Sequence, residues 1–246
     1  MIRTLYLSIL FCLPGLFLGC REDSKTITIN FKLAYDDVPL VMFEDYTYPD
    51  GKKLQITRFS FYLSELSIKQ GSEINLIKDV DFINLTKSHS SLEGARQGLR
   101  YMSEEIEGGF DAISFNFGLT ETQNASVPAD YSSGHPMAKP GEYWVAWDSY
   151  IFVKVEGWID LDNDNTPETG VALHLGSNAV KRSMAKSISN PEEEIEIIID
   201  VHALFENAET GKIYDIAVNP QLHSLSQLPA AEELADNLAQ SISLNN

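Results

Sequence analysis

Residues 160–168, with the sequence DLDNDNTPE, place carboxylates at alternate positions of a polar turn. Side-chain oxygens that wrap around one point are the ligands that a hard cation such as Ca²⁺ requires. The pattern is an incomplete EF-hand loop, because Asn165 occupies the sixth position in place of glycine and Val171 the twelfth in place of glutamate. The segment therefore indicates either a calcium site or a solvated acidic turn. Its candidate ligands are Asp160, Asp162, Asp164 and Glu168.

Histidines are the other side chains in this sequence that suit a metal, and no two of them form a local pair. The five are His89, His135, His174, His202 and His223, with no HxH or HxxxH spacing, so a shared site must gather ligands from separate strands. His174 and His202 lie in expected strands, where their rings should face away from their apolar neighbours. His135 precedes Met137 by two residues, and imidazole with a thioether suits copper(I). We take His174, His202, His135 and Met137 as candidate copper ligands, although an ordinary hydrogen-bonded or surface role is the more common one for any single histidine.

Signatures of catalysis are missing from the sequence. It contains no nucleophile elbow, no glycine-rich phosphate loop and no HExxH segment. Serine, histidine and aspartate residues occur, but no spacing places them together. We therefore expect a binding protein rather than an enzyme.

The N-terminus is typical of an export signal. Residues 1–19 combine a basic start at Arg3 with a short apolar run, which is too short to span a membrane as a mature helix. The ending LFLGC resembles the lipobox of bacterial lipoproteins, which implies lipidation of Cys20 and a tether over residues 20–25. The alternative is an ordinary secretory signal that happens to carry a cysteine. Lipidation would place the chain in the cell envelope, at the periplasmic or surface face of an outer membrane, with the lipid as its stable anchor.

Strong acidity limits the partners. The chain carries 36 Asp and Glu against 18 Lys and Arg, a net charge of −18. Nucleic acid is excluded as a partner, and an anionic membrane surface would repel the protein. Contact with the membrane is therefore assigned to the N-terminal lipid.

Alternating apolar and polar residues predict an all-β domain over residues 26–246, an antiparallel β-sandwich with a short C-terminal helix. A loop rich in proline and glycine is expected over residues 123–141, and the helix is expected to begin at Pro229 or just after it. The expected strands span residues 26–33, 54–69, 74–85 (a pair broken near Asp79), 110–118, 143–157, 170–175, 195–202 and 213–218.

Six blocks of sequence, in their order along the chain, resemble the MbnP-like family of exported copper-binding β proteins. They are TRFSFYLSELSI (57–68), FDAISFNFGL (110–119), AWDSYIFVKVEG (146–157), ALHLG (172–176), IIIDVHALF (197–205) and LADNLA (234–239). The resemblance implies copper binding, with His174 at the position of the family's recurrent histidine. In some relatives a tryptophan is oxidised to kynurenine by a partner dihaem peroxidase of the MauG-like type. Trp147 and Trp144 are the candidates here, although Trp144 is displaced by one residue from the family's W-x-W pattern, and both could be plain core aromatics.

Two functions of different class remain open at this point. One is copper acquisition or handling, which needs two or three imidazole or thioether ligands around one ion and would be favoured by clustering of His174 with His202, His135 or Met137. The other is adhesion or glycan binding, which would be favoured if the histidines are dispersed and Tyr46, Tyr48, Tyr101 or Tyr131 form one exposed patch. A structural lipoprotein, with at most calcium in the acidic turn, is the third reading.

Overall fold

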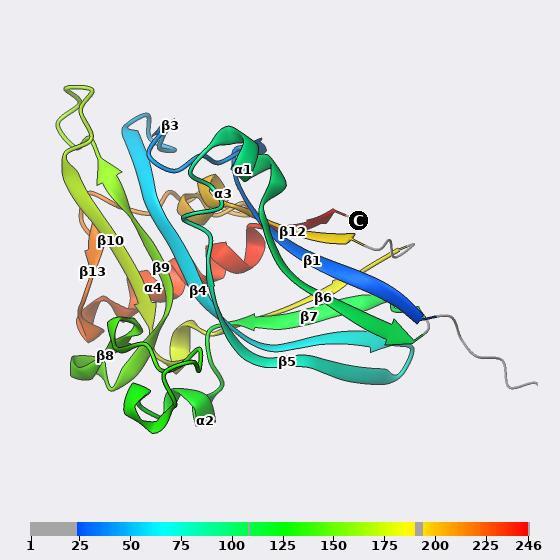
Figure 1. Cartoon of the computed structure of the whole chain (residues 1–246). Coiled ribbons are helices and arrows are strands. Elements are labelled where there is room, and N and C mark those ends of the chain that lie inside the picture. Colours follow the sequence, from blue (N-terminus) through cyan, green and yellow to red (C-terminus); the bar gives the residue numbers. More distant parts are fainter. Residues whose placement is uncertain (1–23, 108, 190–193, 246) are drawn as a thin grey trace, which may run out of the picture.

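Two β-sheets pack face to face in the computed structural model, which describes residues 24–107, 109–189 and 194–245 (Figure 1). The five-stranded sheet contains β1 (Ser24–Tyr35), β2 (Val38–Pro39), β6 (Leu99–Glu107), β12 (Glu194–Asp200) and β14 (Ile242–Asn245). The nine-stranded sheet contains β3 (Asp45–Thr47), β4 (Lys53–Gln70), β5 (Glu73–Asn84), β7 (Ala112–Phe117), β8 (Tyr143–Trp144), β9 (Ser149–Ile159), β10 (Thr169–Gly176), β11 (Arg182–Ser187) and β13 (Gln221–Leu222). The helices are α1 (Leu92–Gln97), α2 (Glu121–Asn124), α3 (Val201–Phe205) and α4 (Leu228–Gln240).

The architecture is sandwich-like, as predicted, but both sheets are mixed rather than purely antiparallel. β1 runs parallel to β12, and β10 runs parallel to β13. Antiparallel neighbours are commonly joined by short turns, whereas these two pairs join segments far apart in the sequence. No local turn therefore sets their direction, and the strand pattern alone could not reveal it.

The core lies between the sheets and follows the predicted alternation. Phe31 of β1 is fully buried and meets Phe61 of β4 edge-on at a centroid distance of 5.5 Å. Phe61 also meets Phe117 of β7 at 4.8 Å. An edge-to-face pair such as Phe31–Phe61 adds about 0.5–1.5 kcal/mol beyond the burial of its area. On β9 the apolar Val153 and Val155 enter the core, which leaves the alternate residues for the outer face of the sheet.

The tryptophan-rich segment is not the single core strand that its composition predicts. Strand β8 ends at Trp144, a 3₁₀ turn covers residues 145–147, and β9 begins at Ser149. The break lies at Asp148, which adopts a left-handed conformation with φ of 50° and accepts a hydrogen bond from the Tyr143 hydroxyl at 2.6 Å. β8 folds back and pairs with β9. Trp144 and Trp147 are therefore half-buried on the outside of the sheet.

Other predicted strands also differ from those observed. The strand expected over residues 195–202 ends at Asp200, whose carboxylate accepts from the His202 backbone N–H at 2.9 Å and caps α3. Residues 213–218 form only an isolated bridge between Ile213 and Glu206. Residues 73–84 make one continuous strand rather than a broken pair. Strands β2, β3, β6, β11, β13 and β14 were not predicted.

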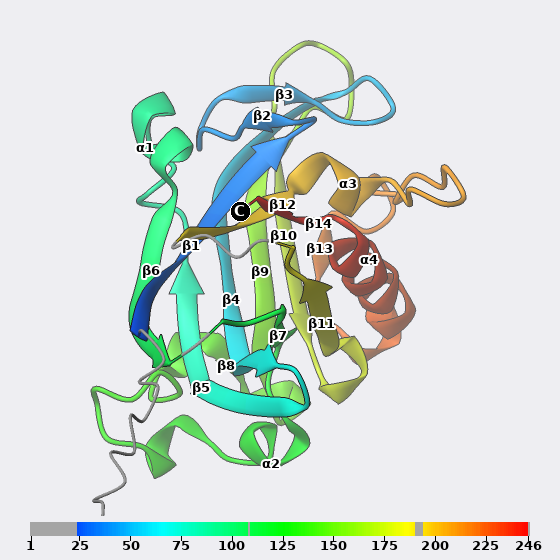
Figure 2. The same cartoon turned by 90° about the vertical axis from the view of Figure 1, so that its right-hand side faces the viewer.

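The predicted C-terminal helix is present as α4, with Pro229 in its first turn. Leu234 and Leu238 are buried against the rest of the fold, while Ile242 begins β14 instead of extending the helix. Figure 2 shows α4 beside α3 and along β10 and β11. The helix therefore covers one side of the sheets.

The N-terminal predictions fall largely outside the described residues. The export signal over residues 1–19 and the lipidation position at Cys20 belong to that part of the chain, and the predicted tether overlaps β1 at Ser24 and Lys25. Among the described residues, no helix has the length and apolar character needed to cross a membrane.

Candidate metal centre

His174 and His223 lie next to each other on the outer face of the larger sheet. The parallel register of β10 and β13 pairs Ala172 with Gln221 and Leu173 with Leu222, so the following residues of the two segments become neighbours. The centroids of the two imidazole rings are 5.1 Å apart, and their planes are inclined by 35°. Parallel pairing therefore gathers two imidazoles that are 49 residues apart in the sequence.

Two stacked indoles complete this cluster. Trp144 and Trp147 stack with a centroid distance of 4.7 Å and an interplanar angle of 11°. Trp144 meets His223 edge-on at 5.0 Å and His174 at 6.0 Å. Trp147 packs against Gly176, where an added Cβ would lie 3.1 Å from the indole ring. The break in the tryptophan segment thus places β8 and the following turn over the histidine pair.

A carboxylate supports one of the imidazoles. His174 Nε2 lies 2.8 Å from Glu156 Oε1, and this hydrogen bond lowers the pKa of the Glu156 carboxyl below its ordinary range. Partial burial, followed by the nearby His174, lowers the pKa of His223. A lowered pKa favours the neutral imidazole, which is the form that binds a metal ion.

Ion pairs hold the tryptophan-bearing segment against the sheet. Glu142, which directly precedes β8, receives Arg58 Nη2 at 2.7 Å and Lys154 Nζ at 2.9 Å. Lys154 also donates to the carbonyl of Gly141 at 2.6 Å. The side chains of Glu142 and Lys154 are nearly buried, and that of Arg58 is partly exposed. Separating the buried Glu142–Lys154 pair would leave an unpaired charge in a site poor in water, which is costly. The loop over the histidines is therefore anchored rather than free.

A comparison with models of protein families shows to which family the chain belongs. The model of the family described as MbnP matches residues 24–224, a range that includes both histidines and the stacked tryptophans. The chain belongs to the MbnP family.

The structure of MbnP from Methylosinus trichosporium is similar to that of this family member, with a TM-score of 0.55 at 10% sequence identity. The match covers 91% of this chain and 99% of the other. At that identity the likeness establishes the MbnP fold alone. No curated protein matches the sequence.

Of the copper ligands predicted from the sequence, only His174 belongs to the cluster. His202 lies in α3 and packs edge-on against Tyr35 at 5.3 Å, so the strand face predicted for it is wrong. His135 stacks on Tyr131 at 4.2 Å, and Met137 is fully buried in the core. Sequence reasoning passed over His223 because nothing in its local sequence marks it, and only the β10–β13 register brings it to His174.

The acidic turn between β9 and β10 gathers its four carboxylates as predicted. Oxygens of Asp160, Asp162, Asp164 and Glu168 all lie within 4.8 Å of one another. Partial desolvation, together with the charges of Asp162 and Asp164, raises the pKa of Glu168. A cation bound among these oxygens would relieve their repulsion. Calcium at this turn stays a prediction.

The tyrosines that a glycan-binding surface would need do not form one exposed patch. Tyr48 is buried and donates to the carbonyl of Tyr214, while Tyr101 donates to Asp81. Tyr46 packs on Tyr35, and Tyr131 stacks on His135.

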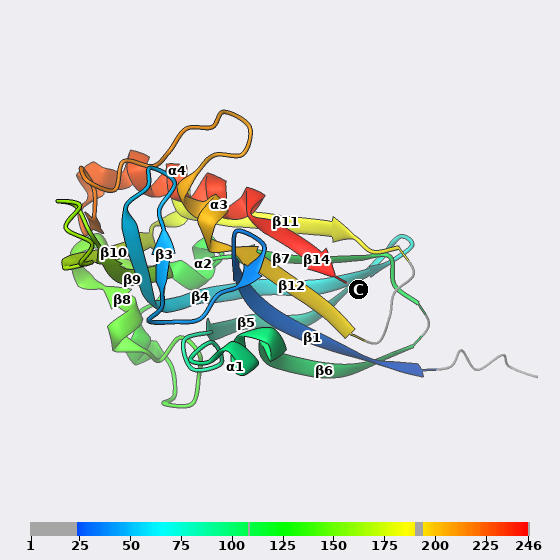
Figure 3. The same ribbon diagram turned by 90° about the horizontal axis from the view of Figure 1, so that it is seen from above.

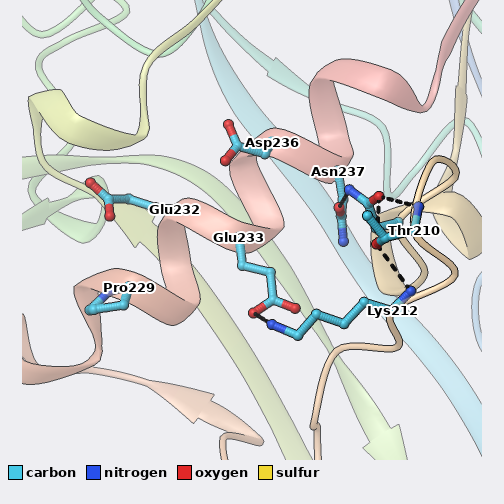
Figure 4. A pocket seen from close by; sticks show the side chains of 8 residues that line it. Thr210, Lys212, Pro229, Glu232, Glu233, Asp236 and Asn237 are labelled. Carbon is cyan, nitrogen blue, oxygen red and sulfur yellow. Dashed lines mark hydrogen bonds and ion pairs between the residues drawn. The ribbon is translucent and has the colours of Figure 1, made fainter.

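A polar hollow of about 310 Å³ beside α4 contains none of the predicted ligands (Figure 4). Lys212 and Glu233 form an ion pair across it at 2.8 Å. Its remaining lining combines two further acids with uncharged residues, namely Glu232, Asp236, Asn207, Thr210, Pro229 and Asn237. The hollow therefore offers no cluster of aromatic or imidazole groups comparable to the histidine pair.

Proposed function

We propose that this MbnP family member binds copper(I) through His174 and His223 and serves in copper acquisition or handling. The observation that carries the proposal is the pairing of the two imidazoles at a centroid distance of 5.1 Å. Imidazole is a good copper ligand, and metal–nitrogen bonds of about 2 Å from both rings are within reach at this separation. The resemblance of the sequence to exported copper-binding proteins supports the same metal.

The surroundings favour the monovalent ion. Trp144 contacts both histidine rings, and aromatic side chains stabilise a cation without supplying hard oxygen ligands. The Glu156 carboxylate, which contacts the pair, is hydrogen-bonded to His174 and lies 3.9 Å from Arg58. A site of few nitrogen ligands and an aromatic cover suits copper(I) better than the oxygen-rich sites of Ca²⁺ or Mg²⁺.

The proposed placement is a lipoprotein of the outer membrane, held by a lipid on Cys20. Figures 1 and 3 both place β8 at one end of the molecule and the start of β1 at the opposite end. The start of β1 is the part of the described chain that follows Cys20 most closely in the sequence. An anchored chain would thus present the histidine pair away from the membrane. The protein would act by binding rather than by catalysis.

Oxidation of a tryptophan by a dihaem MauG-like partner remains a further prediction. Trp144 is the better candidate of the two, because its ring contacts both histidines while Trp147 packs behind it on Gly176. Mass spectrometry of peptides from the native protein would reveal a modified Trp144.

Copper(I) titration against a competing chelator tests the proposed function. The full chain should bind one equivalent, and His174→Ala and His223→Ala should each weaken binding by at least about tenfold, because losing a ligand should cost no less than losing a residue that supports one, which typically costs about 10–100-fold. His202→Ala and His135→Ala are the matched controls and should bind as the unmodified chain does. Equal binding by the unmodified chain, the two site variants and the two controls would exclude the His174–His223 site. Binding lost only in the control variants would exclude it as well.

A further inference from the structure

We propose that Glu156 is a positioning residue that orients His174 and leaves its Nδ1 as the copper ligand. This inference rests on the proposed function and extends it to a residue that does not touch the metal. The contact that carries it is the 2.8 Å hydrogen bond between His174 Nε2 and Glu156 Oε1.

The strand register explains why these two side chains meet. β9 pairs with β10 so that Lys154 lies opposite His174 and Glu156 lies opposite Ala172. Glu156 and His174 are thus diagonal neighbours on the same outer face of the sheet, within reach of long side chains.

The hydrogen bond fixes which ring nitrogen carries the proton. An ionised carboxylate has no proton to donate, so the hydrogen of this contact belongs to Nε2. In the neutral ring the free lone pair is then on Nδ1. A metal at Nε2 would have to displace the carboxylate, whereas a metal at Nδ1 leaves the contact intact. Carboxylates commonly orient ligating histidines in this way.

Glu156 does not serve as a third ligand beside the two imidazoles. Within the described ranges, the acidic turn alone brings three or more histidine, cysteine or acidic ligand atoms within 4.8 Å of one another. Glu156, His174 and His223 therefore do not converge on one point. Since Glu156 is hydrogen-bonded to His174 Nε2, that nitrogen points to the carboxylate and not to a metal position between Glu156, His174 and His223.

Arg58 links this contact to the loop above the site. Its Nη1 lies 3.9 Å from Glu156, while its Nη2 lies 2.7 Å from Glu142. Glu142 precedes the β8 strand that carries Trp144. One chain of charged groups thus restrains both the His174 ring and the segment that covers it.

The test combines ¹⁵N NMR of the histidine rings with copper(I) competition titrations, both on the full chain. Glu156→Ala removes the acceptor, Glu156→Gln keeps an acceptor oxygen without the charge, and Glu209→Ala is the control for loss of an exposed acid. Without copper, His174 should be the Nε2–H tautomer in the unmodified, Glu156→Gln and Glu209→Ala proteins, and a tautomer mixture in Glu156→Ala. Copper(I) affinity should fall about 10–100-fold in Glu156→Ala and remain close to the original in the other two.

Two results would overturn the proposal. One is an unchanged tautomer and affinity in Glu156→Ala. The other is a loss in Glu156→Gln as large as in Glu156→Ala, with copper bound to Nε2, which would make Glu156 a ligand. If the unmodified chain binds no copper, the proposed function fails, and the tautomer comparison still decides whether Glu156 orients His174. Urea unfolding of each variant verifies that an affinity loss does not reflect loss of the fold.

Discussion

Acid should destabilise this protein through His89, a fully buried residue outside the metal centre. His89 Nε2 accepts a hydrogen bond from the Leu33 backbone N–H at 2.9 Å. Its Nδ1 lies 3.0 Å from the carbonyl of Leu85, which can only accept, so the ring proton is on Nδ1. A second proton on Nε2 would face the Leu33 donor in a buried site. Burial accordingly lowers the pKa of His89 to about 4.

The size and sign of the effect follow from the difference between the folded and unfolded pKa values. The folded pKa of about 4 lies below the unfolded value of 6.5, so the unfolded chain binds more protons between these pH values. The contribution of His89 is complete above pH 6.5 and is lost as the pH falls toward 4. At about 1.4 kcal/mol per pKa unit, the loss amounts to roughly 3 kcal/mol.

Urea unfolding at a series of pH values between 4 and 8 measures this loss. His89→Gln retains a donor and an acceptor but cannot be protonated. On acidification its free energy of unfolding should therefore fall by roughly 3 kcal/mol less than that of the unmodified chain. His202→Gln removes an imidazole from α3 and serves as the matched control. A His89 that titrates near 6.5 by NMR, or identical pH profiles for His89→Gln and the unmodified chain, would refute the reasoning.

Three further predictions concern other parts of the molecule. Gly176→Ala should displace Trp147, because the new Cβ would lie 3.0 Å from the backbone oxygen of Tyr150 and 3.1 Å from the Trp147 ring, and the side chain moves more easily than the strand backbone. Near-UV circular dichroism should show weaker indole stacking, and an unchanged spectrum would contradict this packing. Phe61→Ala, which empties a fully buried site, should cost about 3–5 kcal/mol in urea unfolding, and a loss below 1 kcal/mol would argue against this core. Calcium at a hundred times its Kd should stabilise the fold by about 2.7 kcal/mol, and EDTA or Asp162→Asn should abolish the gain; equal melting temperatures with and without calcium would leave the acidic turn as a solvated turn.

Alternation of apolar residues was enough to predict the β-rich sandwich, because its period sets which side of a strand enters the core. Ile29 and Phe31 of β1 are buried as that pattern predicts. The amphipathic spacing of Leu234 and Leu238 likewise predicted α4. The acidic turn was predicted because its carboxylates are close in sequence, so a local loop brings them together.

The histidine pair could not be predicted in the same way, because it depends on pairing between distant segments. His223 follows a two-residue strand whose parallel pairing with β10 has no local signal. The break at Asp148 depends on one left-handed residue, and it moves Trp144 from an expected core strand to the cover of the site. His202 was assigned to a strand because Asp200 was not recognised as a helix cap.

X-ray absorption of the copper(I)-loaded full chain tests the central claim most directly. The His174–His223 site predicts a first shell of nitrogen at about 2 Å with imidazole scattering, altered in His223→Ala and unchanged in His135→Ala. A sulfur shell at about 2.3 Å, or a first shell that is the same with and without the His223 imidazole, would contradict it.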